Sequence, residues 1–321
     1  MPELWKRLLP DWAHPDHPIL QYELAQRRLV GSRRKSILQL FLLALLLGGG
    51  GYLYASATSI DARAENLADF LWRCLYFPSI LVQTATVLAA LAFGIGSVEA
   101  DRSRQTWDSL RVTEFGAGMS LRTRWAALLY RLRAPIIALL LARLVLQFGM
   151  IANMTAFGGG YLRVLSSSIL GASSDIWITL LMVILLMTVQ TLLPLTTVGA
   201  AGAFGILISV AIKQRIFAIA TQFVLSLMIV AAVAGGLIAV TSALGGRLMA
   251  PDGLRFFLLL GYSGFADGGM LLANLGSLGM VWKMLPQGAY LSIGLLLILA
   301  LEACVIDGCL GLAIRLSEQG E

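Results

Sequence analysis

Long apolar stretches alternate with short polar segments along the whole chain. A helix needs about 20 mostly apolar residues to cross the hydrocarbon core of a bilayer. In lipid, only helices and closed barrels satisfy every backbone donor and acceptor. The pattern therefore predicts an all-α, polytopic membrane protein with six transmembrane helices in a domain that covers 36–314. The expected spans are 36–57, 75–98, 135–151, 176–212, 217–240 and 289–314.

Two regions do not fit a plain series of crossings. The stretch 176–212 contains Pro194 followed by several glycines, but two crossings would need about 40 residues plus a turn. We expect one kinked crossing there, with an extra amphipathic or re-entrant piece at its outer end. The segment 241–287 holds apolar runs at 256–260 and 270–278 that are too short to span. They are expected to lie in the outer interface or to dip in as a re-entrant hairpin.

Composition and charge agree with a membrane protein and fix an orientation. Only 13% of the residues are charged, against about 25% in soluble domains. Of the 24 lysines and arginines, 17 fall on one side of the predicted spans and six on the other. Because positive residues favour the cytoplasmic side, both termini are expected there, 1–35 as an interfacial segment and 315–321 as a tail. The net charge of +6 is then a topology signal rather than a sign of nucleic-acid binding.

No catalytic, cofactor or metal site is expected from the residues. The three cysteines show neither metal-ligand spacing nor a disulfide framework. Residues 261–264 match the nucleophile motif of rhomboid-type intramembrane proteases, but Ser263 would need a histidine base. The only histidines, His14 and His17, are predicted on the opposite side of the membrane.

Three charged residues fall inside predicted spans, where charges are costly and usually paired or functional. Arg143 lies roughly 15 Å in from Arg133, and Asp307 roughly 12 Å in from Arg315, at about 1.5 Å per residue. Their matching depth and opposite sign predict an ion pair between Arg143 and Asp307. A role in a substrate path is the alternative. Glu302 lies deeper and has no obvious partner.

A polar segment before the first span, His17–Arg28, is predicted to form a short helix on the inner membrane surface. It begins next to a proline, and Leu20 and Leu24 lie one turn apart. Glu23 and Arg27 have the spacing of an ion pair on a helix. A generic positive flank is the alternative interpretation.

The polar joint between the second and third spans is longer and has two parts, 99–115 and 120–133. Apolar residues in the second part recur at helical spacing, with four arginines between them. This pattern predicts an interfacial helix whose arginines reach lipid headgroups. The apolar stripe consists of Leu121, Trp125, Leu128 and Leu132.

Together these polar segments resemble the membrane permeases of type-2 ATP-binding-cassette exporters. In that family a proline-led segment precedes the first span. A glutamate-rich stretch after the second span leads into a threonine, a short apolar helix and a threonine-proline break. Gln105 stands here where the family has glycine, and Glu114 where it has proline. The matching positions are Glu99, Thr106, Trp107, Leu110 and Thr113.

The resemblance implies that this polar segment is a coupling helix that rests on a separate ATPase. The chain has no phosphate-binding loop, so ATP hydrolysis is expected on another polypeptide. A second permease copy or a paralogue is expected as well, to form a dimer in a bacterial plasma membrane. The coupling residues would be Glu99, Thr106, Trp107, Asp108, Leu110, Arg111 and Thr113. Alternatively, Trp107 only anchors the segment in the headgroup layer.

The sequence thus favours a non-enzymatic permease subunit of an ATP-driven transporter, in contact with lipid and with no nucleic acid. A permease-like structural subunit of a larger membrane complex is the main alternative, because Gln105 and Glu114 depart from the family pattern. A polytopic membrane enzyme is a weaker alternative, since paired histidines and aspartate-rich motifs are missing. Nothing in the sequence names a substrate.

Overall fold

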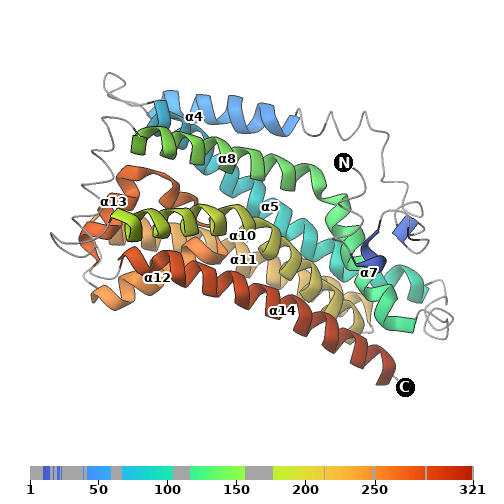
Figure 1. Cartoon of the computed structure of the whole chain (residues 1–321). Coiled ribbons are helices and arrows are strands. Elements are labelled where there is room, and N and C mark those ends of the chain that lie inside the picture. The colour runs from blue at the N-terminus through green and yellow to red at the C-terminus, as the bar shows by residue number, and fades with distance from the viewer. Residues whose placement is uncertain are drawn as a thin grey trace.

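The computed structural model describes residues 10–14, 17, 20, 21, 23, 39, 42–58, 67–103, 116–155, 176–212, 214–247, 250–285 and 288–319. These residues are almost entirely helical and contain no strand. The long helices lie side by side in an elongated bundle (Figure 1). The expected all-α class is therefore confirmed for the part of the chain described.

The bundle is built from helices of very different length. Short turns of helix or π-helix are η1 (Asp11–Ala13), η2 (Leu46–Gly50), η4 (Met270–Ala273) and η5 (Gly288–Tyr290). The shorter α-helices are α4 (Gly51–Thr58), α7 (Gly116–Arg131), α12 (Asp252–Phe265) and α13 (Leu275–Met284). The long helices are α5 (Leu67–Ser103), α8 (Arg133–Thr155), α10 (Ile176–Ala211), α11 (Arg215–Leu244) and α14 (Leu291–Gln319).

Five helices are long and apolar enough to cross a membrane, namely α5, α8, α10, α11 and α14 with its preceding turn. Of the first expected span, 36–57, the structure describes residue 39 and residues from 42 onward, which continue into α4. A sixth crossing stays a prediction. Helix α7 and the C-terminal end of α14 lie at one end of the bundle, called here the α7 end (Figure 1). Helices α12 and α13 lie at the other, the hairpin end.

Helix α10 runs unbroken from Ile176 to Ala211, so the extra piece expected at one end of this stretch is wrong. Its glycines do not interrupt the helix but allow close contact with neighbouring helices. A Cβ at Gly205 would lie 2.6 Å from the carbonyl oxygen of Leu91 and 3.0 Å from Cα of Gly94. The absence of side chains lets α10 and α5 touch through their backbones, as small residues commonly do between membrane helices.

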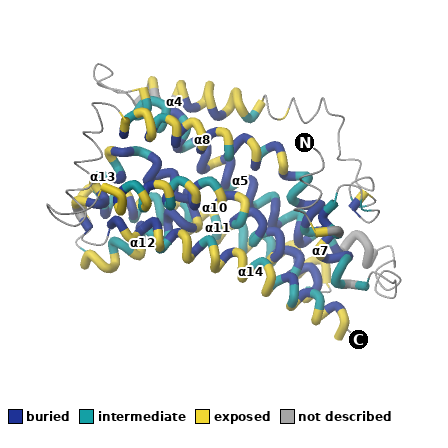
Figure 2. The backbone as a smooth tube through the Cα atoms, in the orientation of Figure 1, coloured by how far each residue is buried: buried dark blue, intermediate teal, exposed yellow. Residues whose placement is uncertain are grey.

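Buried residues face the middle of the bundle, and exposed apolar residues cover the outward faces of α4, α8 and α14 (Figure 2). Helix α11 is the extreme case, because only 6% of its most apolar window is buried. It contacts mainly α5 and α12. Such exposed apolar faces suit a surface that lipid or another membrane chain covers.

Candidate functional site

A buried arginine on α8 gathers four segments of the chain into one cluster. Arg143 is only 2% exposed. Its Nη2 donates to Oε1 of Gln83 at 2.7 Å and to the carbonyl of Asp267 at 2.9 Å. Its Nη1 donates to the carbonyls of Gly268, at 2.5 Å, and Gln190. We call Arg143 and these four partners the clasp.

One member of the clasp is a backbone carbonyl that lacks its helical hydrogen bond because of a proline. Proline has no backbone N–H, so in a helix interior it removes the bond to the residue four positions earlier. Pro194 lies inside α10 and therefore leaves the Gln190 carbonyl without its helical donor. Arg143 supplies the missing donor from a neighbouring helix. This is a local reason why a buried carbonyl and a buried guanidinium meet here.

The other side of the clasp is a tight turn between α12 and η4. Gly268 and Gly269 have positive φ angles of 60° and 82°, a backbone region that glycine occupies without steric penalty. The Asp267 carboxylate accepts the backbone N–H groups of Gly269 at 2.7 Å and Leu271 at 2.8 Å. A Cβ at Gly268 would overlap the Arg143 guanidinium. The turn is thus shaped to receive this arginine.

The position of the clasp places the turn between α12 and η4 deep within the bundle, and α12, η4 and α13 are called here the hairpin. Arg143 lies twelve residues before the end of α8, and Gln190 fourteen residues after the start of α10. At about 1.5 Å per residue, these positions are roughly 18–21 Å from the hairpin ends of their helices. Since Asp267 and Gly268 bind Arg143, their turn reaches that depth. The re-entrant and interfacial arrangements expected for 241–287 stay predictions.

A row of polar side chains on α5 holds the hairpin along its length. Asp69, Trp72, Tyr76 and Gln83 recur at intervals that place them on one helical face. Asp69 accepts from Nδ2 of Asn274 at 2.8 Å, and Trp72 Nε1 donates to the carbonyl of Met270 at 2.9 Å. The hydroxyls of Tyr76 and Tyr262 are 3.1 Å apart. The hairpin is therefore fixed by hydrogen bonds as well as by apolar packing.

The predicted ion pair between Arg143 and Asp307 is wrong. All the hydrogen bonds of Arg143 described above go to α5, α10 and the hairpin turn. Asp307 is exposed on α14 instead. Glu302 and Asp307 are five residues apart, about 140° around a helix with 3.6 residues per turn. They cannot both face the interior, and Glu302 is the one that does.

Glu302, which had no obvious partner in the sequence, is bound by α10. It is 4% exposed, and its two carboxyl oxygens lie 2.5 and 2.9 Å from the hydroxyls of Thr196 and Thr197. Both hydroxyls are also within hydrogen-bonding distance of the Leu193 carbonyl. The acid thus fastens α14 to α10 just past Pro194.

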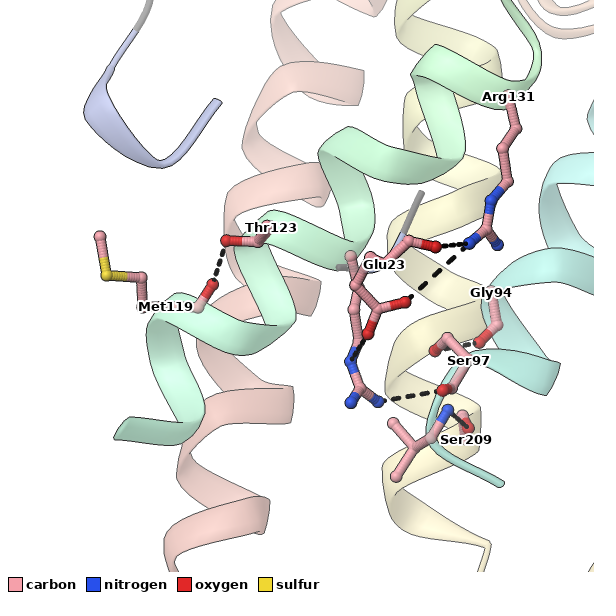
Figure 3. A network of polar contacts seen from close by, with 9 residues as sticks. Glu23, Gly94, Ser97, Met119, Thr123, Arg131 and Ser209 are labelled. Carbon is pink, nitrogen blue, oxygen red and sulfur yellow. Dashed lines mark hydrogen bonds and ion pairs between the residues drawn. The ribbon is translucent and has the colours of Figure 1, made fainter. Parts of the chain in front are cut away.

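A second polar cluster lies at the α7 end, and Figure 3 shows it from close by. The Glu23 carboxylate forms an ion pair with Arg124, whose Nε lies 3.1 Å from it, and the Glu23 backbone carbonyl accepts a hydrogen bond from Nη2 of Arg131 at 2.8 Å. Arg124 Nη1 also donates to the carbonyl of Ser97, near the end of α5, at 3.0 Å. We call Glu23, Ser97, Arg124 and Arg131 the joint. It connects the N-terminal segment, α5 and α7.

The joint extends to α10 through two neighbouring bonds. The backbone N–H of Val98 donates to Oγ of Ser209 at 3.2 Å (Figure 3). Trp125 Nε1 donates to the carbonyl of Gly199 at 2.9 Å. Hydrogen bonds therefore connect helix α7 to both α5 and α10.

These contacts correct the prediction for the 120–133 stretch. Its apolar stripe packs against the bundle, with Leu121 fully buried and Leu128 3% exposed. Arg124, 4% exposed, points into the joint rather than to headgroups, whereas Arg122 and Arg133 are exposed. The helical spacing correctly predicts an apolar face on this helix, but the face packs against protein.

The expected coupling residues mostly lie outside the part of the chain described. Glu99 belongs to the last turns of α5, which ends at Ser103. The structure does not describe Thr106, Trp107, Asp108, Leu110, Arg111 and Thr113. Their role stays a prediction. Within the described ranges, no group of three or more histidine, cysteine or acidic side chains could hold a metal ion.

Comparisons of the chain with protein-family models, curated proteins and solved structures found no match. The site therefore stands on its geometry alone. The clasp was missed at the sequence level, although its turn has a signal in Asp267, Gly268 and Gly269. Aspartate followed by glycine is a strong turn signal, and it follows an apolar run here. Only the depth of insertion had no sequence signal.

Proposed function

We propose that this chain is the membrane subunit of an ATP-driven transporter, with ATP hydrolysis on a separate polypeptide. The joint is the observation that carries the proposal. A transport subunit driven from outside must pass force from a polar surface segment into its spans. Arg124 and Arg131 connect α7 to the N-terminal segment, and Arg124 also reaches α5.

The location of the joint supports this function further. The undescribed stretch 104–115 leaves α5 and enters α7, so a protein bound to it would act on both. Helix α7 continues through backbone hydrogen bonds at Leu132 and Ile136 into α8. A displacement of α7 would therefore reach α5, α8 and α10 together. The hairpin at the opposite end would act as an outer closure.

Co-purification from the native membrane in mild detergent tests the proposal. The tagged chain should retain an ATPase, measured as ATP hydrolysis in the purified sample. The double variant Trp107→Ala and Leu110→Ala should lose both the ATPase and the hydrolysis, because aromatic and aliphatic anchors commonly dominate interfaces. Trp177→Ala is the matched control, since Trp177 is 77% exposed at the hairpin end and should have no effect.

A permease-like structural subunit is the second candidate, and the clasp favours it. Arg143 binds α5, α10 and the hairpin turn at once, which suits a fixed scaffold. If the unaltered chain purifies with other membrane proteins and without any ATPase, the transport proposal is wrong and the structural role replaces it.

A further inference from the structure

Of the three acidic residues on α14, Glu302 alone is buried. It lies eleven residues after the start of α14, and its partner Thr196 lies fifteen residues before the end of α10. At about 1.5 Å per residue, these positions are roughly 17 and 22 Å from the nearest helix ends. The carboxyl group therefore lies near the middle of two helices that are long and apolar enough to cross a membrane.

Within the part of the chain that the structure describes, no positive charge lies beside this carboxyl group. Its interactions are with Thr196 and Thr197, and α10 contains no charged residue. The charged and titratable residues of the other two helices packed against α14 do not interact with Glu302, namely Arg122, Arg124 and Arg131 on α7, and Asp252, Arg255 and Tyr262 on α12. A buried carboxylate without a paired charge is very costly, and such a group normally becomes neutral instead.

The oxygen contacts around Glu302 outnumber the protons that an ionised carboxylate would leave available. Its two carboxyl oxygens lie 2.5 and 2.9 Å from the hydroxyls of Thr196 and Thr197. The same hydroxyls lie 3.1 and 2.8 Å from the Leu193 carbonyl. Each of these four contacts needs a proton between its oxygens, but two hydroxyls supply only two. An ionised Glu302 would therefore leave two close pairs of oxygens without a proton.

A neutral carboxyl group supplies a third proton. Its hydroxyl at Oε2 can donate to Oγ1 of Thr196, which then donates its own proton to the Leu193 carbonyl. Thr197 donates to Oε1 of Glu302 at the same time. Three of the four contacts are then hydrogen bonds, with separations in the ordinary range for O–H donors or close to it. The geometry thus favours the protonated acid.

We propose that Glu302 is a proton-binding site within the spans, where the carboxyl group holds one proton at neutral pH and donates it to Thr196. The acid belongs to α14 and the hydroxyls belong to α10, so the proton is bound at the contact between two long helices. Ionisable groups that face the interior of a membrane bundle commonly mark proton relays and ion pathways. This site goes beyond the transport function and does not depend on it.

Infrared spectroscopy of the purified protein in lipid nanodiscs at neutral pH tests the site. A protonated carboxyl group has a C=O stretch at higher frequency than a carboxylate and clear of the backbone amide band. The unaltered chain should show this band. Glu302→Gln keeps the shape and a donor of the neutral acid, and the difference spectrum should show the loss of the Glu302 contribution. Asp307→Asn removes an exposed acid of the same helix and, as the matched control, should leave the band unchanged.

Glutamate labelled with carbon-13 gives a second measurement, on the unaltered chain. Labelling should move the band to lower frequency, whereas the band of a protonated aspartate would stay in place. If Glu302→Gln does not fold, Thr196→Val identifies the residue, because loss of the hydroxyl acceptor should shift a Glu302 band and no other.

Three results would overturn the proposal. The first is a spectrum without a protonated glutamate band. The second is a glutamate band that the changes at Glu302 or Thr196 leave in place. The third is a band that disappears when sodium chloride is added at constant pH, since the site would then bind a metal cation rather than a proton.

Discussion

Arg143 donates a hydrogen bond to the main-chain carbonyl of Gln190, the group that Pro194 deprives of its helical donor. A side chain of α8 thus completes the backbone bonding of α10. The same guanidinium holds the carbonyls of Asp267 and Gly268 in the hairpin turn. Arg143 therefore replaces a missing backbone hydrogen bond in α10 and also fixes the position of the hairpin turn.

Replacing Arg143 with leucine should strongly destabilise the protein. The change leaves the carbonyls of Gln190 and Gly268 without these donors and the buried Asp267 without its nearby positive charge. Each buried polar group left without its hydrogen-bond partner costs about 1–3 kcal/mol. The apparent melting temperature in detergent should fall by several degrees, and protease should cut the hairpin faster.

Arg122→Leu is the matched control for that change. Arg122 is exposed on α7, and surface substitutions usually change stability by less than about 0.5 kcal/mol. This variant should therefore melt close to the unaltered protein. An equal loss in both variants would contradict the role given to the clasp.

A double-mutant cycle between Arg143 and Pro194 should show coupling. Pro194→Ala restores a backbone N–H that can donate to Gln190, so this carbonyl no longer needs the arginine. Part of the loss caused by Arg143→Leu should therefore disappear when Pro194→Ala is present. Neighbouring sites of this kind couple by about 0.5–3 kcal/mol, measured from the four unfolding free energies. Additive changes would mean that the freed carbonyl contributes nothing.

The glycine contact between α5 and α10 predicts two opposite outcomes for the same substitution. Gly205→Ala should destabilise the protein, because its Cβ would lie 2.6 Å from the Leu91 carbonyl oxygen. Gly96→Ala should be neutral or stabilising by up to about 1 kcal/mol, since no neighbouring atom among the described residues lies within 4 Å of the added Cβ and alanine favours helix. Thermal unfolding of both variants tests this, and equal effects would contradict the close backbone approach.

The charge asymmetry of the sequence predicts that the hairpin end and the C-terminus lie on opposite sides of the membrane. Ser263 is fully buried, so it is a poor labelling position. Gly253 and Glu318 are exposed at opposite ends of the bundle. Cysteines placed there should react with a membrane-impermeant maleimide from opposite sides of sealed vesicles. Labelling of both from one side would contradict the orientation.

The sequence predicted six spans, and the described residues contain five helices long and apolar enough to be such spans, because apolar length is a property of each segment alone. The sequence predicted the wrong partner for Arg143, because the depth of a residue along a helix does not determine which way its side chain faces. Asp307 had the right depth and sign but lies on the exposed face of α14. Asp267, placed outside the spans by the sequence, is the carboxylate that lies beside the arginine. Its position depends on the hairpin insertion, a long-range feature.

The apolar stripe of α7 is a second example of what the sequence pattern leaves undecided. Helical periodicity correctly placed Leu121 and Leu128 on one face, yet lipid and protein are both apolar environments. Only the contacts of Trp125 and Arg124 with α10 and α5 decide between them. A pattern of hydrophobicity therefore predicts a buried face in a membrane chain without naming what buries it.

The clasp also divides the bundle into mechanical parts. Arg143 bonds α5, α10 and the hairpin turn at one point, so a slide of about an ångström between α8 and α10 would stretch several bonds at once. These elements are expected to move as one rigid block. Helix α11, with almost no buried surface in its most apolar window, is the element left to shift against that block. Any opening of the hairpin end would then be a hinge on the α11 side.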